Sequence, residues 1–247
     1  MMISFFEEFP NDSCLKKLDL IDFDTKIYLG ARSFKEFNGY KRKIKNKHVK
    51  EIIYWPILLE EQGYWFSPWV KSKYVEQIFK ELKNEPVMID LELPKNRKLM
   101  ILESFNFFKN RFLLRKLIKE YHGDKYTAEY FSGRNFVSSL MQFFGINMSP
   151  NKYGNKIIKM IYRSIWSISD QEFKKVLEYG KILYKDSFLV GLGCIDLGIN
   201  ANESLLSEWE LGRDLRICME VGIREVIIFR LNGLNYLYKK EIKKISL

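Results

Sequence analysis

The chain has 247 residues, of which 47% are hydrophobic and 15% aromatic, a composition that supports one large core and excludes a disordered protein. Its net charge of +10 comes from 41 lysines and arginines against 31 acidic residues. Because these cations decorate predicted helix ends and exposed faces, we expect a solvated, lysine-rich surface and no nucleic-acid partner.

The sequence also indicates the surroundings of the protein. No apolar run approaches the roughly 20 residues that a membrane-spanning helix requires, and the N-terminus lacks the pattern of a signal peptide. Cys14, Cys194 and Cys218 have no metal-type spacing and suit a reducing compartment. We therefore predict a cytoplasmic protein without a membrane partner. The sequence does not indicate its oligomeric state.

Short apolar runs alternate with longer segments of helical period from one end of the chain to the other. The predicted strands are 3–6, 26–29, 51–55, 87–90, 126–129, 157–162, 188–192 and 225–229. The predicted helices are 33–45, 72–83, 97–121, 135–144, 169–183, 203–221 and 232–243. The first connection, 12–20, is predicted to hold only one or two helical turns.

This alternation predicts the fold class. Eight strands alternating with helices in 247 residues are typical of a closed parallel barrel. We therefore predict a single (β/α)8 TIM barrel that spans residues 1–247. An open, doubly wound sheet is the alternative, but Phe6-Glu7-Glu8-Phe9-Pro10 after the first strand lacks the glycines of a phosphate-binding turn.

The predicted helix 97–121 carries an apolar stripe. Phe105, Phe108, Phe112 and the segment 113–117 recur at helical spacing. This pattern predicts a helix face that packs against the barrel.

The fourth predicted strand ends in two carboxylates within the apolar run Pro86-Val87-Met88-Ile89-Asp90-Leu91-Glu92-Leu93-Pro94. Side chains of a strand alternate with period two, so Asp90 and Glu92 are predicted to point the same way. Barrel enzymes build their sites at the carboxyl ends of the strands, which makes this pair the first candidate for catalysis.

The other strand ends and one loop supply further candidates. Carboxylates with aromatic neighbours and only two histidines favour glycoside chemistry, in which a carboxylic acid protonates the leaving oxygen and aromatic rings stack on sugars. Crowding by Asp90 is expected to raise the pKa of Glu92. The predicted catalytic residues are Glu92, Asp90, Glu129 and Tyr162. The predicted substrate-binding residues are Glu8, Trp55, Trp65, Trp69, Arg163, Asp196 and Arg230.

A resemblance to a known family adds to this reading. Ile89-Asp90-Leu91-Glu92 resembles the end of the strand-four motif of family 18 glycoside hydrolases, Asp-x-x-Asp-x-Asp-x-Glu, and Met160-Ile161-Tyr162 is similar to that family's Met-x-Tyr. The resemblance implies that Glu92 is the general acid, that Asp90 orients the acetamido group of the substrate and that Tyr162 hydrogen-bonds it. The sugar's own amide would then be the nucleophile.

The chain departs from the family pattern at several positions. Glu85 and Met88 stand where the family has its two earlier aspartates, and Arg163 follows Tyr162 where an aspartate is usual. Phe229 ends the eighth strand, where the family has a tryptophan.

Three alternatives remain open. In the first, Asp90 or Glu92 forms a structural ion pair with Arg163, Arg230 or Lys95 at the barrel rim. The preferred interpretation involves no cofactor and no metal. In the second alternative, Mg²⁺ or Mn²⁺ is bound, and arginines clamp a phosphorylated or sugar substrate. Its metal ligands would be Glu7 or Glu8, Asp90 or Glu92, Glu129 and Asp196, and its arginines Arg134, Arg163 and Arg230. In the third, a non-catalytic barrel binds a carbohydrate or a protein through exposed aromatic residues of the loop 64–69.

Overall fold

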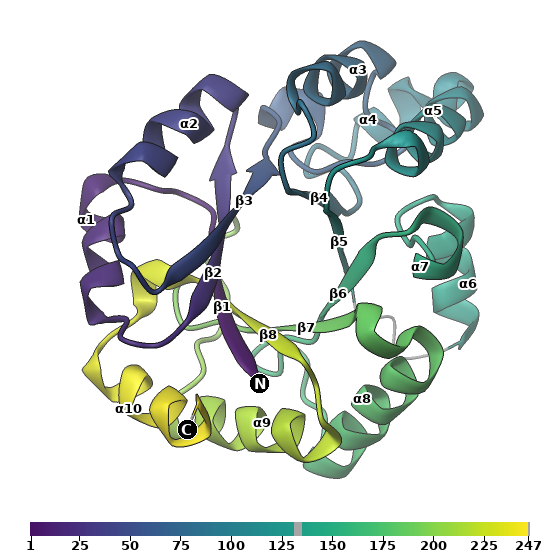
Figure 1. The fold of residues 1–247 in the computed structure, drawn as a ribbon. Coiled ribbons are helices and arrows are strands. Elements are labelled where there is room, and N and C mark those ends of the chain that lie inside the picture. Colours follow the sequence, from purple (N-terminus) through teal and green to yellow (C-terminus); the bar gives the residue numbers. More distant parts are fainter. Residues whose placement is uncertain (131–134, 247) are drawn as a thin grey trace.

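The computed structural model describes residues 1–130 and 135–246. These residues form a closed barrel of eight parallel strands in chain order, with helices around its outside (Figure 1). Each strand pairs with the next one, and β8 returns to pair with β1. The predicted (β/α)8 TIM barrel is therefore confirmed.

The elements follow the predicted order. The strands are β1 (Met2–Glu7), β2 (Thr25–Ala31), β3 (Val49–Pro56), β4 (Val87–Leu91), β5 (Lys125–Tyr130), β6 (Lys156–Met160), β7 (Phe188–Gly193) and β8 (Glu225–Phe229). The α-helices are α1 (Asp12–Leu15), α2 (Phe34–Lys43), α3 (Ser72–Glu81), α4 (Leu99–Leu102), α5 (Phe107–Glu120), α6 (Asn135–Phe143), α7 (Pro150–Tyr153), α8 (Asp170–Tyr184), α9 (Glu208–Val221) and α10 (Tyr236–Ser246). The 3-10 helices are η1 (Lys16–Leu20), η2 (Glu60–Gln62), η3 (Ser104–Asn106), η4 (Lys185–Ser187) and η5 (Leu231–Gly233).

Three predicted helices differ clearly in their bounds. The helix predicted over 232–243 is observed as η5 followed by α10, which begins at Tyr236. The predicted helix 97–121 is divided into α4, η3 and α5. The helix predicted from residue 203 begins at Glu208, because the Ser207 side chain caps the helix and Glu210 completes a capping box. The residues between β7 and α9 therefore form a long loop at the carboxyl ends of the strands.

Alternation along the strands divides side chains between the barrel interior and the layer beneath the helices. On β4, Met88 packs in the interior and Leu91 packs in the outer layer. The parallel register then extends this division to β5, since Asp90 is paired with Ala128 and Leu91 with Glu129. Asp90 and Ala128 therefore share the interior side, whereas Glu129 lies on the helix side.

The predicted apolar stripe packs only in part. Leu114 is buried and Leu117 packs against the outer layer, as predicted, but the phenylalanines of the stripe do not pack, so that part of the prediction is wrong. Phe105, Phe108 and Phe112 are 99%, 67% and 72% exposed. The helix instead buries a second stripe of the same period, which consists of Phe107, Asn110, Leu114 and Ile118. Because both stripes repeat at helical spacing, periodicity alone does not identify the packed face.

The described part of the chain contains no helix that is both long and apolar enough to cross a membrane.

The three cysteines are all buried and unpaired with one another. Cys14 and Cys218 pack in the outer hydrophobic layer, whereas Cys194 packs with the interior residues at the end of β7.

Close packing of α8 on β7 gives a test of the fold. A Cβ atom at Gly180 would lie 2.2 Å from Cζ of Phe188. We expect Gly180→Ala to lower the free energy of unfolding by about 1–3 kcal/mol, despite the better helix propensity of alanine. Gly39→Ala on α2, where no atom lies within 4 Å of the added carbon, should raise it by about 0.5–1 kcal/mol. Urea unfolding of both variants measures the difference, and equal responses would contradict the packing.

Candidate active site

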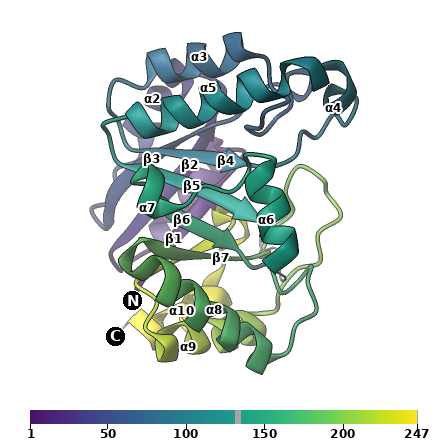
Figure 2. The ribbon, with the colours of Figure 1, turned by 90° about the vertical axis from the view of Figure 1, so that its right-hand side faces the viewer.

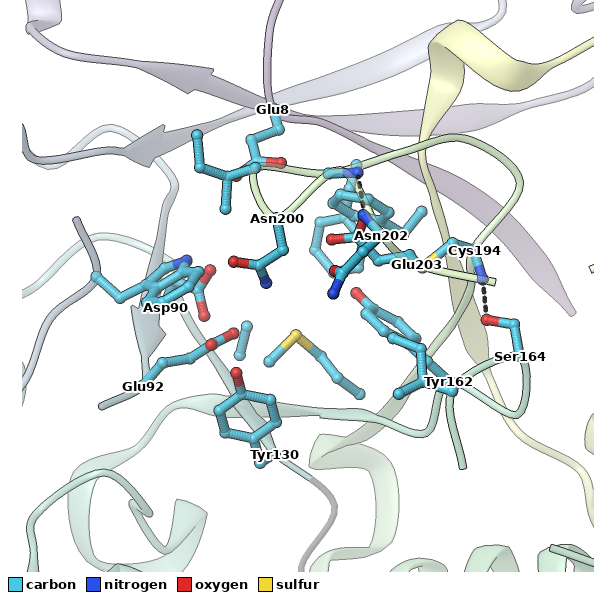
Figure 3. Close-up of a pocket in the computed structure, with 18 of the residues that line it drawn as sticks. Glu8, Asp90, Glu92, Tyr130, Tyr162, Ser164, Cys194, Asn200, Asn202 and Glu203 are labelled. Carbon is cyan, nitrogen blue, oxygen red and sulfur yellow. Dashed lines mark hydrogen bonds between the residues drawn. The ribbon is translucent and has the colours of Figure 1, made fainter. Parts of the chain in front are cut away.

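A cavity of about 380 Å³ opens at the carboxyl ends of the strands. Three carboxyl side chains, Glu8, Asp90 and Glu92, line it together with Tyr130 and Tyr162 (Figure 3). In that view Asp90 and Glu92 lie next to each other, Tyr162 lies across the cavity from them, and Glu8 points in from the top. Acidic and phenolic groups from four different strand ends therefore meet at one place.

Strand alternation brings these side chains together. Glu8 lies two residues beyond the interior Phe6, and Tyr162 lies two beyond the interior Met160. Asp90 and Glu92 continue the interior series of β4, and Tyr130 continues that of β5. Each of these residues therefore lies two positions after an interior residue of the same strand and points to the same side.

Burial dominates the electrostatics of Asp90 and Glu92. They are 3% and 5% exposed, and Oδ1 of Asp90 and Oε2 of Glu92 accept no hydrogen bond from the described residues. Desolvation raises the pKa of Glu92 to about 8, although the Tyr130 hydroxyl opposes the shift by hydrogen-bonding the carboxylate. Desolvation, followed by the neighbouring Glu92 carboxyl, raises the pKa of Asp90 well above its usual range. Glu92 therefore keeps its proton at neutral pH, and burial displaces the pKa of Asp90 in the same direction.

Glu8 is the third carboxyl group and is held by a tyrosine. The Tyr64 hydroxyl donates to Oε1 of Glu8 at 2.7 Å. Burial raises the pKa of Glu8 to about 7, and the hydrogen bond from Tyr64 reduces this shift. This hydrogen bond joins the loop after β3, which carries Tyr64, to Glu8 at the end of β1.

This loop does not present an exposed aromatic surface. The four aromatic residues of this loop are buried, namely Tyr64, Trp65, Phe66 and Trp69. The third alternative predicted that they are exposed, and that prediction is wrong. Trp65 lines the cavity. Trp69 faces elsewhere and packs on Phe107, with ring centroids 5.0 Å apart.

The structure brings together some of the predicted site residues and separates others. Six of them line the cavity, namely Glu8, Trp55, Trp65, Asp90, Glu92 and Tyr162. Five are not among its lining residues, namely Trp69, Glu129, Arg163, Asp196 and Arg230.

Glu129 belongs to the packing layer outside the barrel. Its Oε2 accepts from Nζ of Lys159 at 2.8 Å, and its Oε1 accepts from the backbone N–H of Met148 at 2.6 Å. Because neighbouring residues of a strand point to opposite faces of the sheet, Glu129 points away from the cavity and Tyr130 points into it. Glu129 is thus buried and bound to a cation, which is the arrangement of a structural ion pair.

Arg230 is held outside the cavity by two of the other candidates. Its Nη1 lies 2.8 Å from Oε1 of Glu7, and its Nη2 lies 2.9 Å from Oδ2 of Asp196. Asp196 also accepts from the Asn232 side chain at 2.8 Å. These residues tie the first strand to the ends of β7 and β8 rather than facing a substrate.

The proposed rim ion pairs with the two β4 carboxyl groups are not formed. Arg163 binds Asp214 at 2.6 Å and Asp170 at 2.7 Å. Lys95 pairs with Glu60 at 3.0 Å. The cations named for this alternative therefore have other partners.

The all-oxygen metal site of the second alternative is likewise not assembled. Glu7 and Asp196 share Arg230, and Glu129 binds Lys159. Among residues 1–130 and 135–246, no three acidic, histidine or cysteine side chains lie close enough to hold an ion. Arg134, named as a phosphate clamp, lies outside the described residues.

Several residues that line the cavity are not among the predicted site residues. Tyr130 could have been found, because it lies two positions beyond the interior Ala128. Asn200, Asn202 and Glu203 line the cavity from the loop after β7. Sequence period had placed Glu203 within a helix, and the capping box at Ser207 was the signal that this segment is a loop.

Comparison with known proteins identifies the architecture. The sequence matches no protein-family model and no curated protein. The structure is similar to the PgaB (BpsB) glycoside hydrolase domain from Bordetella bronchiseptica, with a TM-score of 0.62 and 10% identity over 99% of this chain and 98% of that chain. A chitinase from Chromobacterium violaceum gives a TM-score of 0.59 at 10% identity, over 99% and 98% of the two chains. A GH18 chitinase from Pseudoalteromonas aurantia gives 0.58 at 12% identity, over 100% of both chains. At these identities the likeness establishes the fold alone, a TIM barrel.

The raised pKa of Glu92 makes stability depend on pH. The folded state keeps a proton up to about pH 8 that the unfolded chain releases near its ordinary value of 4.5, so stability falls as pH rises through this window. Glu92→Gln removes this titration and should make the protein more stable than wild type near pH 8 by about 1–3 kcal/mol. Unfolding over a pH series measures the slope, with the exposed Glu178→Gln as control. Parallel curves for wild type and Glu92→Gln would rule out a proton held by Glu92.

Proposed function

We propose that this protein is a glycoside-hydrolase-like enzyme that acts on a glycan, with Glu92 as the general acid. One observation carries the proposal: buried carboxyl groups with raised pKa values line an open cavity at the carboxyl ends of a barrel. A structural pair would be neutralised by a neighbouring cation, whereas a catalytic acid must keep its proton at the working pH.

The properties of Glu92 suit proton donation to a glycosidic oxygen. A carboxylic acid with a pKa of about 8 is protonated at neutral pH. The Tyr130 hydroxyl hydrogen-bonds its carboxyl group, which fixes its position and supports the anion once the proton has left. As the proton moves to the leaving oxygen, the bond between that oxygen and the anomeric carbon breaks.

Aromatic side chains around the cavity suit the apolar faces of sugar rings. Trp55 and Trp65 line its buried part, and the half-exposed Trp166 lines its mouth. Indole rings offer flat apolar surfaces, and a cavity with such walls and a few polar groups is typical of a small-ligand site.

The family resemblance suggests the nucleophile. Asp90 would orient an acetamido group and Tyr162 would hydrogen-bond it, so that the amide oxygen of the substrate attacks the anomeric carbon. Both side chains line the cavity that contains Glu92. Tyr162 is further positioned by Phe229, whose ring centroid lies 5.8 Å from its own.

A second candidate function is glycan binding without turnover. Met88 is the interior residue that precedes Asp90 on β4, two positions earlier in the sequence, and the family has an aspartate there. Asp90 thus has no carboxylate below it with which to share a proton. This difference favours a weakened or lost reaction, with the cavity and its aromatic walls retained.

Substitution of two glutamates on neighbouring strands separates these possibilities. Glu92→Gln should lower the release of reducing ends from N-acetylated oligosaccharides by roughly 10²–10⁴-fold, the range typical of a lost general acid. The melting midpoint of this variant should still rise when oligosaccharide is added, because binding remains. Glu129→Gln should retain turnover but lower the midpoint, because Lys159 loses its partner. Full activity of Glu92→Gln would refute its role, and binding by wild type without turnover would select the second candidate.

The pH profile of turnover offers an independent readout. If Glu92 donates the proton, kcat/KM should fall as pH rises through about 8, because the donor then loses its proton. Tyr130→Phe removes a hydrogen bond that lowers the pKa of Glu92, so the alkaline limb should move to higher pH. An alkaline limb that stays in place would exclude Glu92 as the titrating group.

A further inference from the structure

An unpartnered apolar surface lies where the chain leads from β4 into α5. Ile101 and Leu102 of α4, Phe105 of η3, and Phe108 and Phe112 of α5 are 78%, 68%, 99%, 67% and 72% exposed. Phe108 and Phe112 are four residues apart and therefore share one face of α5. We call these five residues the Phe105 surface. Figure 2 shows α4 beyond one end of α5, at the edge of the molecule.

The same segment carries a concentration of positive charge. Residues 97–120 contain seven lysines and arginines and two glutamates, which gives a net charge of +5 out of +10 for the chain. One of these glutamates, Glu103, is buried and accepts from the Asn106 side chain. The cations alternate along α5 with the exposed phenylalanines, so apolar and basic groups share one surface.

A cationic cavity adjoins this surface. Arg111, Arg115 and Lys152 line a hollow of about 260 Å³. The Arg111 guanidinium lies 5.5 Å from the ring centroid of Phe143, which also lines it. The Nε atoms of both arginines are buried and donate to no described acceptor, and Nη2 of Arg115 donates to the backbone carbonyl of Gln142 at 2.6 Å, which leaves the other terminal nitrogens for a phosphate group. Guanidinium groups with unused donors suit the oxygens of a phosphate group.

We propose that the Phe105 surface docks on an anionic lipid bilayer, with its apolar side chains among the lipid headgroups and the neighbouring cations on the lipid phosphates. Apolar side chains flanked by lysine and arginine are typical of segments that lie in a membrane interface. A side chain that is 99% exposed, such as Phe105, projects outward instead of lining a groove. A bilayer can receive such projections without a matching surface.

Other occupants fit these observations less well. Single-stranded nucleic acid would stack its bases on the phenylalanines, but Ile101 and Leu102 have no ring to offer and would stay in water. The prediction of no membrane partner depended on the lack of a long apolar run. Interfacial binding needs no such run, because the apolar side chains enter only the headgroup region.

Docking would also orient the cavity. The connection from β4 to α4 leaves the carboxyl end of the barrel, the end at which the cavity opens, and Figure 2 shows α4 on the side to which the strands point. A protein bound through the Phe105 surface would therefore hold the mouth of the cavity near the plane of the lipid headgroups.

Vesicle flotation of the full-length protein tests the proposal. Vesicles of phosphatidylcholine alone are compared with equimolar phosphatidylcholine and phosphatidylglycerol. We expect binding to the mixed vesicles to exceed binding to the neutral ones by at least about tenfold, and to weaken as salt is added. The double variant Phe105→Ser/Phe108→Ser should lower partitioning by about tenfold or more, since two apolar side chains no longer leave water. Its melting midpoint should fall only slightly, because Phe105 is fully exposed and Phe108 keeps only edge contacts with the rings of Phe107 and Phe143.

Further variants separate the apolar from the charged contribution. Arg111→Gln/Arg115→Gln should lower binding to the mixed vesicles by about tenfold and leave binding to neutral vesicles unchanged. Tyr179→Ser/Ile182→Ser on the exposed face of α8 is the matched control and should bind as wild type does. In Phe105→Trp, the tryptophan emission should shift to the blue on mixed vesicles.

Three outcomes would overturn the proposal. The first is equal, weak binding of wild type and Phe105→Ser/Phe108→Ser to both kinds of vesicle. The second is loss of binding in the α8 control to the same extent. The third is self-association of the wild type in sedimentation that Phe105→Ser/Phe108→Ser abolishes, because the surface would then be an interface between two copies of the chain.

Discussion

The two-residue alternation of side chains in a closed barrel is the constraint on which the site depends. A closed sheet has only an interior and a helix-covered exterior, so each strand residue belongs to one or the other. Asp90 and Glu92 belong to the interior and lose their water. Glu129, on the adjacent strand, belongs to the exterior, where Lys159 neutralises it. The side of the sheet to which a side chain points thus separates an acid that keeps its proton from an ion pair.

The cavity keeps its acidic protons because strong cations are bound elsewhere. An arginine in contact with Glu92 would lower its pKa and convert it to a carboxylate at neutral pH. Arg230 is instead held by Glu7 and Asp196, and Arg163 is held by Asp214 and Asp170. These ion pairs join neighbouring strands and helices. They therefore stabilise the rim, and the charges of Arg230 and Arg97 lower the pKa values of Glu8 and Glu92 by less than burial raises them.

Strand period and element order were sufficient to predict the barrel, and the strand ends led to the β4 pair. The errors have identifiable physical causes. Glu129 was chosen for its place at a strand end, although alternation from Ala128 selects Tyr130. The helical period predicts that the helix begins at residue 203, whereas the cap formed by Ser207 and Glu210 begins it at Glu208 and leaves 203–207 in the loop after β7. The packed face of α5 could not be predicted, because phenylalanines lie on both of its faces, the buried stripe includes the polar Asn110, and only tertiary contacts decide between the two faces.

The three cysteines are buried, and their burial makes the fold resistant to oxidation. Burial raises the pKa of the Cys194 thiol to about 12 and that of the Cys218 thiol well above its usual range. Oxidation and disulfide exchange proceed through an accessible thiolate, which these residues do not offer. The barrel is therefore held together by packing that is indifferent to redox potential. Its shape and its cavity would be the same in the presence of glutathione or of oxygen.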